Sequence, residues 1–401
     1  MEDLRTDIKN TLLNSNKKHF VLECATGVGK TYLALQKVNQ LYSQDSKILI
    51  VIPRNVLIQN WIEEFKKWHY EDMLSNVTFV TYMSLPKMAG YWDICIFDEC
   101  HHLSERCREA LDEFFINHTI FLSATISKDV NEFISGKYNR YKELEWIKVN
   151  TKKAIINEVL PDPTILLYPM QLDNTKADFL YTPRKPKHKN DKPLIVSYAD
   201  RWKYKGYKGY YQIKCTQRQY YNELSGIIDW YKRKSYTPAM KNLWLHKAGE
   251  RLQWLAWQKL KSINQMLAVA KGRRSIVFCG TIEQTEAISI PCVNSKVGTD
   301  NLDKFNVGKI DTISCVNMLD EGANLYNCQI GIFDMINSSQ RMQIQKVGRL
   351  LRHKNPIIII PYFKATREEE IVVKMLENYS TNTIERFVSL QTLEEHLKQY
   401  E

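Results

Sequence analysis

The stretch Ala25-Thr26-Gly27-Val28-Gly29-Lys30-Thr31 decides the fold of this 401-residue chain. An apolar run, His19–Cys24, precedes it, and a segment with helical apolar spacing follows it. A strand, a glycine-containing turn and a helix in this order predict a loop whose backbone N–H groups face phosphate oxygens. In such a loop Lys30 reaches the β- and γ-phosphates and Thr31 binds Mg²⁺. The alternative is a glycine-rich helix cap with a surface lysine, but the flanking strand and helix favour the phosphate loop.

The first 150 residues alternate short apolar runs with amphipathic stretches, a pattern typical of βαβ units around a parallel sheet. These runs are His19–Cys24, Lys47–Ile52, Val77–Thr81, Asp93–Phe97 and Thr119–Leu122. A later series predicts a second sheet, to which Ile165–Tyr168 adds a strand: Ser275–Cys279, Thr312–Val316, Gln329–Phe333 and Pro356–Pro361. Because single hydrophobic cores stop growing at roughly 250–300 residues, a chain of this length is expected to hold two α/β domains.

A pair of carboxylates follows one of these runs directly. Asp98 and Glu99 come immediately after Asp93–Phe97 and are followed by Cys100 and His101. At the carboxyl end of a strand beside a phosphate loop, one carboxylate can hold the Mg²⁺ shell and its neighbour can orient or deprotonate the attacking water. We therefore assign Asp98 to magnesium and Glu99 to water. The alternative is an acidic helix N-terminus without chemistry.

The C-terminal part of the chain supplies candidate cations for the same chemistry. Gln345, Arg349 and Arg352 are spaced by four and three residues, so a helix would carry them on one face. From there they can converge on a γ-phosphate, where a cation accelerates phosphoryl transfer by ~10³–10⁵ in related systems. The alternative is a basic helix face that points into solvent.

Positive charge is concentrated between residues 182 and 218. The chain has a formal charge of +11, and this segment contains eleven Lys or Arg against two Asp. Its densest part, around Trp202, Lys203 and Lys205, interleaves aromatic rings with lysines, which suits unpaired bases and their phosphates. The alternatives are a solvated loop for this segment and a small helical core for the other four tryptophans between 173 and 265. The segments Gln217–Lys234 and Ala239–Ala270 are expected to be helices.

Composition limits the class of protein. No run approaches the ~18 apolar residues of a membrane helix, and from Met1 to Asn10 we expect no targeting signal. Nine cysteines are scattered without a CxxC pair, which indicates reduced core residues rather than disulfides or metal ligands. We expect a cytoplasmic protein without membrane contact, from the cytosol of a bacterium or a phage-infected host.

Taken together, these motifs resemble those of superfamily 2 helicases of the DExH type. The similarity extends over nearly the whole chain outside the segment between 173 and 265. Eight elements occur in the order of the family's motifs: Ala25–Thr31, Val51–Pro53 with Gln59–Trp61, Val80–Tyr82, Asp98–His101, Ser123–Thr125, Ile276–Cys279, Asp320–Asn324 and Gln345–Arg352.

The resemblance implies two RecA-like lobes that hold ATP and Mg²⁺ in the cleft between them, while a nucleic-acid strand crosses both lobes. It implies these roles: strand contacts at Pro53, Arg54, Thr81 and Tyr82, coupling at His101, Ser123, Thr125 and Gly322, and an adenine-side contact at Arg5. Two positions depart from the family. The glutamine expected shortly after Leu4-Arg5 is missing, and Asn324 replaces the usual aspartate.

The expected organisation is a first lobe at 1–150, a second lobe at 151–172 and 266–401, and a basic, largely helical insertion at 173–265. The leading functional hypothesis is an ATP-dependent DNA helicase or branch-remodelling translocase. Its motifs resemble those of small phage and bacterial remodelling enzymes and restriction-enzyme motor subunits. An RNA helicase is the first alternative. The second is a nucleic-acid-gated ATPase subunit of a larger complex that separates no strands.

Overall fold

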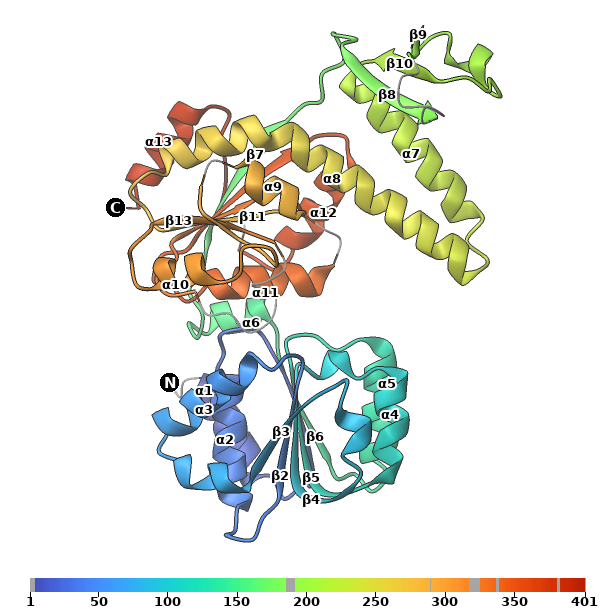
Figure 1. Cartoon of the computed structure of the whole chain (residues 1–401). Coiled ribbons are helices and arrows are strands. Elements are labelled where there is room, and N and C mark those ends of the chain that lie inside the picture. Colours follow the sequence, from blue (N-terminus) through green and yellow to red (C-terminus); the bar gives the residue numbers. More distant parts are fainter. Residues whose placement is uncertain are drawn as a thin grey trace.

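The chain folds into two α/β lobes, one above the other, and an arm that leaves the side of the second lobe (Figure 1). The structure is a computed structural model that describes residues 4–184, 192–288, 290–316, 325–336, 339–380 and 383–400. The side chains at 340–342, 344 and 345 are outside this description. Both lobes are built on parallel sheets, which confirms the predicted pair of RecA-like lobes.

Lobe 1 is built on six parallel strands in the order β3-β2-β4-β5-β1-β6. They are β1 (His19–Cys24), β2 (Ile48–Ile52), β3 (Val77–Thr81), β4 (Gly90–Asp98), β5 (Phe114–Ser123) and β6 (Leu144–Val149). The first five match the predicted apolar runs. The sixth was not predicted, because polar residues interrupt the apolar ones in this edge strand.

Helices cover both faces of this sheet. Those of lobe 1 are α1 (Leu4–Asn14), α2 (Lys30–Leu41), α3 (Leu57–Lys67), α4 (Glu105–Ala110) and α5 (Lys128–Tyr138), and α6 (Thr151–Ile156) leads to lobe 2. Short 3₁₀ turns are η1 (Glu71–Asn76), η2 (Leu85–Lys87), η3 (Cys100–His102) and η4 (Leu111–Glu113). The first three helices pack on one face, and α4 and α5 pack on the other. The strand ends between them are thus left open at the edge that faces lobe 2.

Lobe 2 is built on seven parallel strands in the order β12-β13-β11-β14-β15-β7-β16. They are β7 (Thr164–Met170), β11 (Ser275–Phe278), β12 (Cys292–Val293), β13 (Thr312–Cys315), β14 (Ile330–Phe333), β15 (Ile357–Phe363) and β16 (Ile384–Arg386). Its helices are α9 (Ile282–Ala287), α10 (Asp300–Asn306), α11 (Gln340–Leu350), α12 (Arg367–Leu376) and α13 (Leu390–Lys398). The run Ile165–Tyr168 forms the central part of β7, as predicted.

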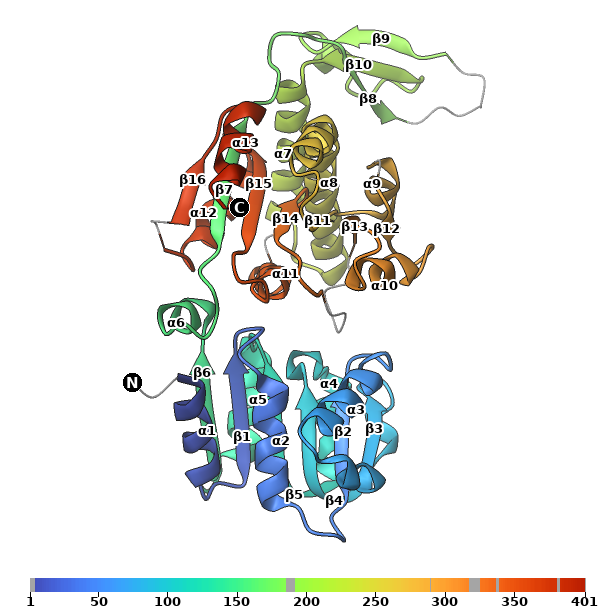
Figure 2. The same cartoon turned by 90° about the vertical axis from the view of Figure 1, so that its left-hand side faces the viewer.

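The segment between the two parts of lobe 2 contains a sheet as well as helices. Its elements are β8 (Phe179–Arg184), β9 (Leu194–Ser197), η5 (Arg201–Tyr204), β10 (Tyr211–Cys215), α7 (Gln217–Arg233) and α8 (Pro238–Val269). Central β10 pairs antiparallel with β8 and parallel with β9, at the end of the molecule opposite lobe 1 (Figure 2). Both helices were predicted, but the sheet was not, because its strands are short and lie in a Pro/Lys-rich stretch. Helix α8 continues through residue 265, the expected end of the insertion.

The second half of α8 is part of the core of lobe 2. Lys259 and Glu368 are completely buried, and Lys259 Nζ lies 2.7 Å from Glu368 Oε1. The lysine also donates to the carbonyl of Pro361 at 3.3 Å, while Glu368 Oε2 accepts the backbone N–H of Phe363 at 3.1 Å. This buried ion pair fastens α8, and with it the arm, to α12 and β15.

Asp334, at the end of β14, predicts a pH-dependent stability. Its side chain is 1% exposed, and neither carboxyl oxygen has a hydrogen-bond partner among the residues that the structure describes. Burial raises its pKa to about 7, with Lys259 acting in the opposite direction. Between about pH 4 and pH 7 the folded state therefore holds a proton that the unfolded chain has lost. We expect stability to fall as the pH rises through this interval and to level off above it.

The variant Asp334→Asn should remove this dependence and be more stable than the wild type at pH 8, by ~2–4 kcal/mol. Urea unfolding at pH 5 and pH 8 measures both values. Asp311→Asn, at an exposed aspartate of the same lobe, is the control and should keep the wild-type pH dependence. Equal pH dependence in Asp334→Asn and the wild type would contradict the prediction.

All nine cysteines are free thiols and eight are buried, with Cys292 partly exposed. In the part of the chain that the structure describes, no helix is both long enough and apolar enough to cross a membrane.

Candidate active site

The predicted phosphate loop lies between β1 and α2, at the carboxyl edge of the lobe 1 sheet. Gly27 and Gly29 have φ values of +93° and +100°, a left-handed conformation that glycine adopts without the steric cost of a Cβ. Gly29 is also the residue that caps the N-terminus of α2. Lys30 Nζ donates to the carbonyl of Cys24 at 2.9 Å, so the lysine lies over its own loop. The glycines thus have the conformation that such a loop requires.

The carboxylate pair lies at the end of β4, and lobe 1 holds it from two sides. Trp61 on α3 donates its indole N–H to Asp98 Oδ2 at 3.0 Å, and Tyr82 donates its hydroxyl to the Asp98 backbone carbonyl at 2.8 Å. Glu99 has a φ of +49°, which is uncommon for a residue other than glycine. This backbone conformation turns the chain sharply after β4, so that two consecutive carboxylates both reach the pocket.

The two carboxylates differ in their electrostatic surroundings. Burial and the adjacent negative charge of Glu99 raise the pKa of Asp98 above its usual range. Burial also acts to raise the pKa of Glu99, but His101, Lys30 and Arg349 outweigh it and hold that pKa below its usual range. Glu99 is therefore the ionised member of the pair, which suits a group that accepts a hydrogen bond or a proton from water.

A short polar chain connects Glu99 with the next strand end. His101 Nδ1 lies 3.3 Å from Glu99 Oε2 and 3.1 Å from Ser123 Oγ, which in turn donates to the Thr125 carbonyl at 2.7 Å. The His101 side chain is only 2% exposed. Three of the four residues expected to act in coupling, His101, Ser123 and Thr125, therefore form one connected group beside the carboxylates.

Lobe 2 approaches the phosphate loop through α11. A Cβ at Gly348 would lie 2.4 Å from Thr26 Cβ, so only glycine allows this approach. Arg349 is 7% exposed and lines the pocket together with Arg352. Arg352 was predicted on the same helix face, but α11 ends at Leu350, so this arginine reaches the pocket from the turn beyond the helix.

Two residues of the family motifs, Gly322 and Asn324, lie outside the residues that the structure describes. The backbone at Gln345 is part of α11, but its side chain is outside the described part.

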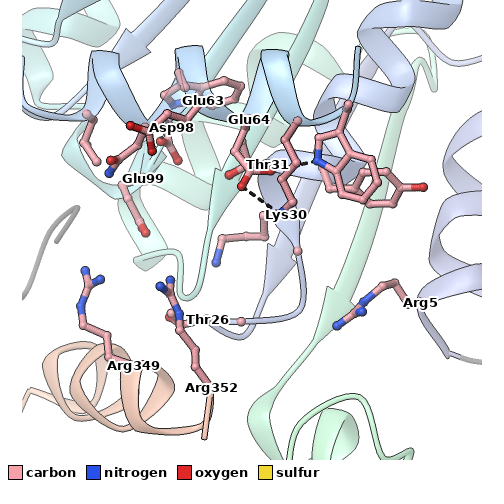
Figure 3. Close-up of a pocket in the computed structure, with 18 of the residues that line it drawn as sticks. Arg5, Thr26, Lys30, Thr31, Glu63, Glu64, Asp98, Glu99, Arg349 and Arg352 are labelled. Atoms are coloured by element: carbon pink, nitrogen blue, oxygen red, sulfur yellow. Dashed lines mark hydrogen bonds and ion pairs between the residues drawn. The ribbon is translucent and has the colours of Figure 1, made fainter. Parts of the chain in front are cut away.

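Residues of both lobes line a cavity of about 720 Å³, within the range of small-molecule sites. Figure 3 shows Arg349 and Arg352 reaching from lobe 2 toward Lys30 and Glu99, with Arg5 at the other end of the pocket. The predicted residues that line the cavity are Arg5, Thr26, Gly27, Gly29, Lys30, Thr31, Asp98, Glu99, Arg349 and Arg352. Val28 is buried behind the loop, where its carbonyl accepts a hydrogen bond from Arg5 Nε at 3.0 Å.

Sequence reasoning assigned no role to several residues of this cavity. Tyr32 and Trp68 form an aromatic corner with ring centroids 4.2 Å apart, and the Trp68 indole donates to Glu64 at 2.9 Å. Trp61 was noted only as part of a motif. Helical spacing offered one signal, because Trp61, Glu64 and Trp68 are three and four residues apart and share one side of α3 and its continuation.

The site fits a nucleotide with Mg²⁺. The buried hydroxyl of Thr26 has no hydrogen-bond partner among the described residues, which suits a polar ligand atom in the pocket. Asp98 and Thr31 line the pocket with a carboxylate and a hydroxyl, the hard oxygen ligands that Mg²⁺ prefers.

The residues predicted to contact a strand lie in different environments. Pro53 and Arg54 follow β2, Thr81 ends β3, and Arg54 is exposed. Tyr82 is only 6% exposed and bonded to Asp98. The ring packs in the core and fixes the end of β4, and the strand contact expected at Tyr82 stays a prediction. Burial raises its pKa well above the usual value, so the hydroxyl stays protonated as a donor.

The aromatic and basic residues predicted in the insertion lie on and beside η5. Trp202 is 68% exposed, and Lys203 and Lys205 are exposed as well. Lys203 Nζ lies 2.7 Å from Asp200 and 5.6 Å from the Trp202 ring centroid. These side chains are exposed to solvent, and none of them lines the cavity between the lobes.

The sequence of lobe 1 and the fold of both lobes are similar to those of known proteins. Residues 2–128 match the family model described as the res subunit of type III restriction enzymes. None of the curated proteins matches the chain in sequence. Among solved structures, S. cerevisiae Dbp5 bound to RNA and ADP BeF3 is 11% identical with a TM-score of 0.61, over 98% of this chain and 92% of that one.

Two further structures extend the comparison. The helicase domain of Pyrococcus furiosus Hef is 13% identical with a TM-score of 0.51, over 93% of this chain and 98% of that one. The ATP-dependent type ISP restriction-modification enzyme LlaBIII bound to DNA is 13% identical with a TM-score of 0.56, over 100% of this chain and 32% of that one. Residues 2–128 are thus similar in sequence to a restriction-enzyme subunit, and the two lobes together have the fold of these helicase and restriction-enzyme structures.

Proposed function

We propose that the chain is a DExH-type, ATP-dependent motor that moves on DNA, unwinding or remodelling it. The observation that carries the proposal is the cavity lined by both lobes, in which Lys30 and Glu99 of lobe 1 face Arg349 of lobe 2. Because the site is complete only when the lobes are together, ATP binding and hydrolysis can close and reopen the gap between them.

Each side chain of the site has a defined task in this proposal. Lys30 leaves the Cys24 carbonyl to bind the β- and γ-phosphates, and Glu99, held ionised, orients the attacking water and accepts its proton. Asp98 and Thr31 would hold Mg²⁺, which would supply positive charge to neutralise the phosphates. Arg349 and Arg352 stabilise the negative charge of the transferred phosphoryl group from lobe 2.

DNA is favoured over RNA by the match of residues 2–128 to a restriction-enzyme subunit. RNA is the alternative, favoured by the fold shared with Dbp5, which was solved bound to RNA. A motor subunit that hydrolyses ATP on nucleic acid without separating strands is compatible with the same site.

The proposal is tested by measuring ATP turnover with single-stranded DNA, duplex DNA, forked DNA and RNA, followed by strand displacement. We expect DNA to raise turnover more than RNA does, and a fork or duplex to be unwound. A larger response to RNA would reverse the choice of substrate, and ATP turnover without displacement would favour the gated ATPase. The absence of any response would refute the motor.

The exposed lysines of the insertion predict a salt-dependent contribution to binding. Replacing Lys203, Lys205 and Lys208 by glutamine should weaken DNA binding and flatten the plot of log affinity against log salt, by ~0.7–0.9 for each lost phosphate contact. Anisotropy titrations at several salt concentrations measure the slope. A control variant with Lys18, Lys128 and Lys398 replaced removes the same charge from other exposed positions and should keep the wild-type slope. If both variants had the same slope, the insertion lysines would be solvated side chains that do not contact DNA phosphates.

A further inference from the structure

The arm formed by α7 and α8 ends in a tip that has almost no core of its own. We define the tip as residues 227–247, which include the end of α7, the turn and the start of α8. Ile228 is the single buried residue among these 21 described positions. Figure 1 shows the tip at the free end of the arm, away from the sheet of lobe 2. A segment this exposed contributes little to the stability of the lobe.

The tip nevertheless presents large apolar side chains to solvent. Tyr236 is 87% exposed, Trp230 is 47% exposed, and Leu243 and Leu245 are each nearly half exposed. Exposed apolar groups gathered on one projecting element typically mark an interaction surface. The four other tryptophans of the insertion were expected to fill a small helical core. Trp230 does not, because nearly half of its side chain is exposed.

The tip is also positively charged. The tip carries five Lys or Arg against one Asp: Lys232, Arg233, Lys234, Lys241 and Lys247 against Asp229. Lys234 Nζ lies 4.3 Å from the centroid of the Trp230 ring, and Lys232 Nζ lies 5.9 Å from that of Trp244. The surface is thus both aromatic and strongly positive, so its partner is expected to combine flat apolar groups with negative charge.

We propose that the tip binds single-stranded nucleic acid, with bases stacked on Trp230 and Tyr236 and phosphates held by the adjacent lysines. Aromatic faces stack on any unpaired base, and neutralised phosphates release counterions that favour binding. Bases inside a duplex are stacked on one another, which favours an unpaired strand. This inference rests on the proposed function and adds a second contact surface to it.

The tip surface is separate from the basic sheet around η5. Residues 217–226 of α7 lie between them, a stretch of helix of roughly 15 Å at 1.5 Å per residue. A nucleic-acid strand that reaches the tip therefore runs along the arm and does not contact the small sheet alone. The two surfaces can be tested independently, since no residue is common to both.

The test is the double variant Trp230→Ala with Tyr236→Ala, compared with Phe115→Ala with Tyr141→Ala. The control removes two aromatic rings that are 73% and 84% exposed on lobe 1. Anisotropy with a labelled single-stranded oligonucleotide should show a rise in Kd of about tenfold or more for the tip variant. The control should stay within twofold of the wild type. Turnover of ATP without nucleic acid should be unchanged in both, because neither pair lines the cavity.

The outcomes separate the two proposals. A wild-type chain that binds no polynucleotide refutes the proposed function and this inference together. A wild type that binds and a tip variant with unchanged Kd refute the inference alone. If light scattering shows that the wild type self-associates and the tip variant does not, the tip is an interface between copies of the chain, which also overturns the inference.

Discussion

Replacing Glu99 by glutamine is expected to lower the rate constant for ATP hydrolysis by about 10²–10⁴-fold, the usual contribution of a general base. The carboxylate is ionised because His101, Lys30 and Arg349 together outweigh its burial. Glutamine keeps the size and one acceptor oxygen but cannot take a proton from water. Single-turnover measurement of ATP cleavage gives the rate, and titration with a fluorescent nucleotide gives the affinity, which should change by only a few-fold.

The matched control for this variant is Glu109→Gln, at an exposed glutamate of α4. It removes the same charge outside the pocket and should hydrolyse ATP at the wild-type rate. Turnover in Glu99→Gln equal to that of the control would remove Glu99 from its proposed role. Loss of nucleotide binding as well as turnover would instead show that Glu99 shapes the pocket.

The second large effect is expected on stability, at the buried ion pair between α8 and α12. Lys259→Met should destabilise lobe 2 by ~3–5 kcal/mol, because it leaves the carboxylate of Glu368 buried without its cation. Thermal unfolding followed by calorimetry would show this as a shift of the lobe 2 transition to lower temperature. The transition of lobe 1, which does not contact the pair, should keep its midpoint.

Combining Lys259→Met with Glu368→Gln should recover most of this loss. The amide is neutral, yet its oxygen still accepts the backbone N–H of Phe363. If the double variant were as unstable as Lys259→Met, packing of the lysine stem rather than charge would be the cause. If Lys259→Met alone had no effect, the ion pair would contribute nothing to the attachment of the arm.

Sequence patterns predicted the elements of lobe 1 well because each depends on a short stretch of chain. A short run rich in apolar residues next to a turn indicates a strand, so β1 and β3 have the predicted bounds. The strands β8, β9 and β10 were not predicted, since their few apolar residues stand among lysines and prolines. Their pairing joins residues 17 to 36 positions apart, which no local pattern shows.

The site likewise has one part that local sequence predicts and another that depends on the tertiary structure. The amino-acid sequence alone determined the phosphate loop and the carboxylates, because glycine conformation and the end of a strand are local properties. Tertiary structure decided which side chains meet. It brings Arg349 toward Glu99 across some 250 residues of chain, buries Tyr82 against Asp98, and leaves Trp230 in solvent at the end of the arm. Burial and contact depend on how distant elements pack, and that packing is a property of the whole fold.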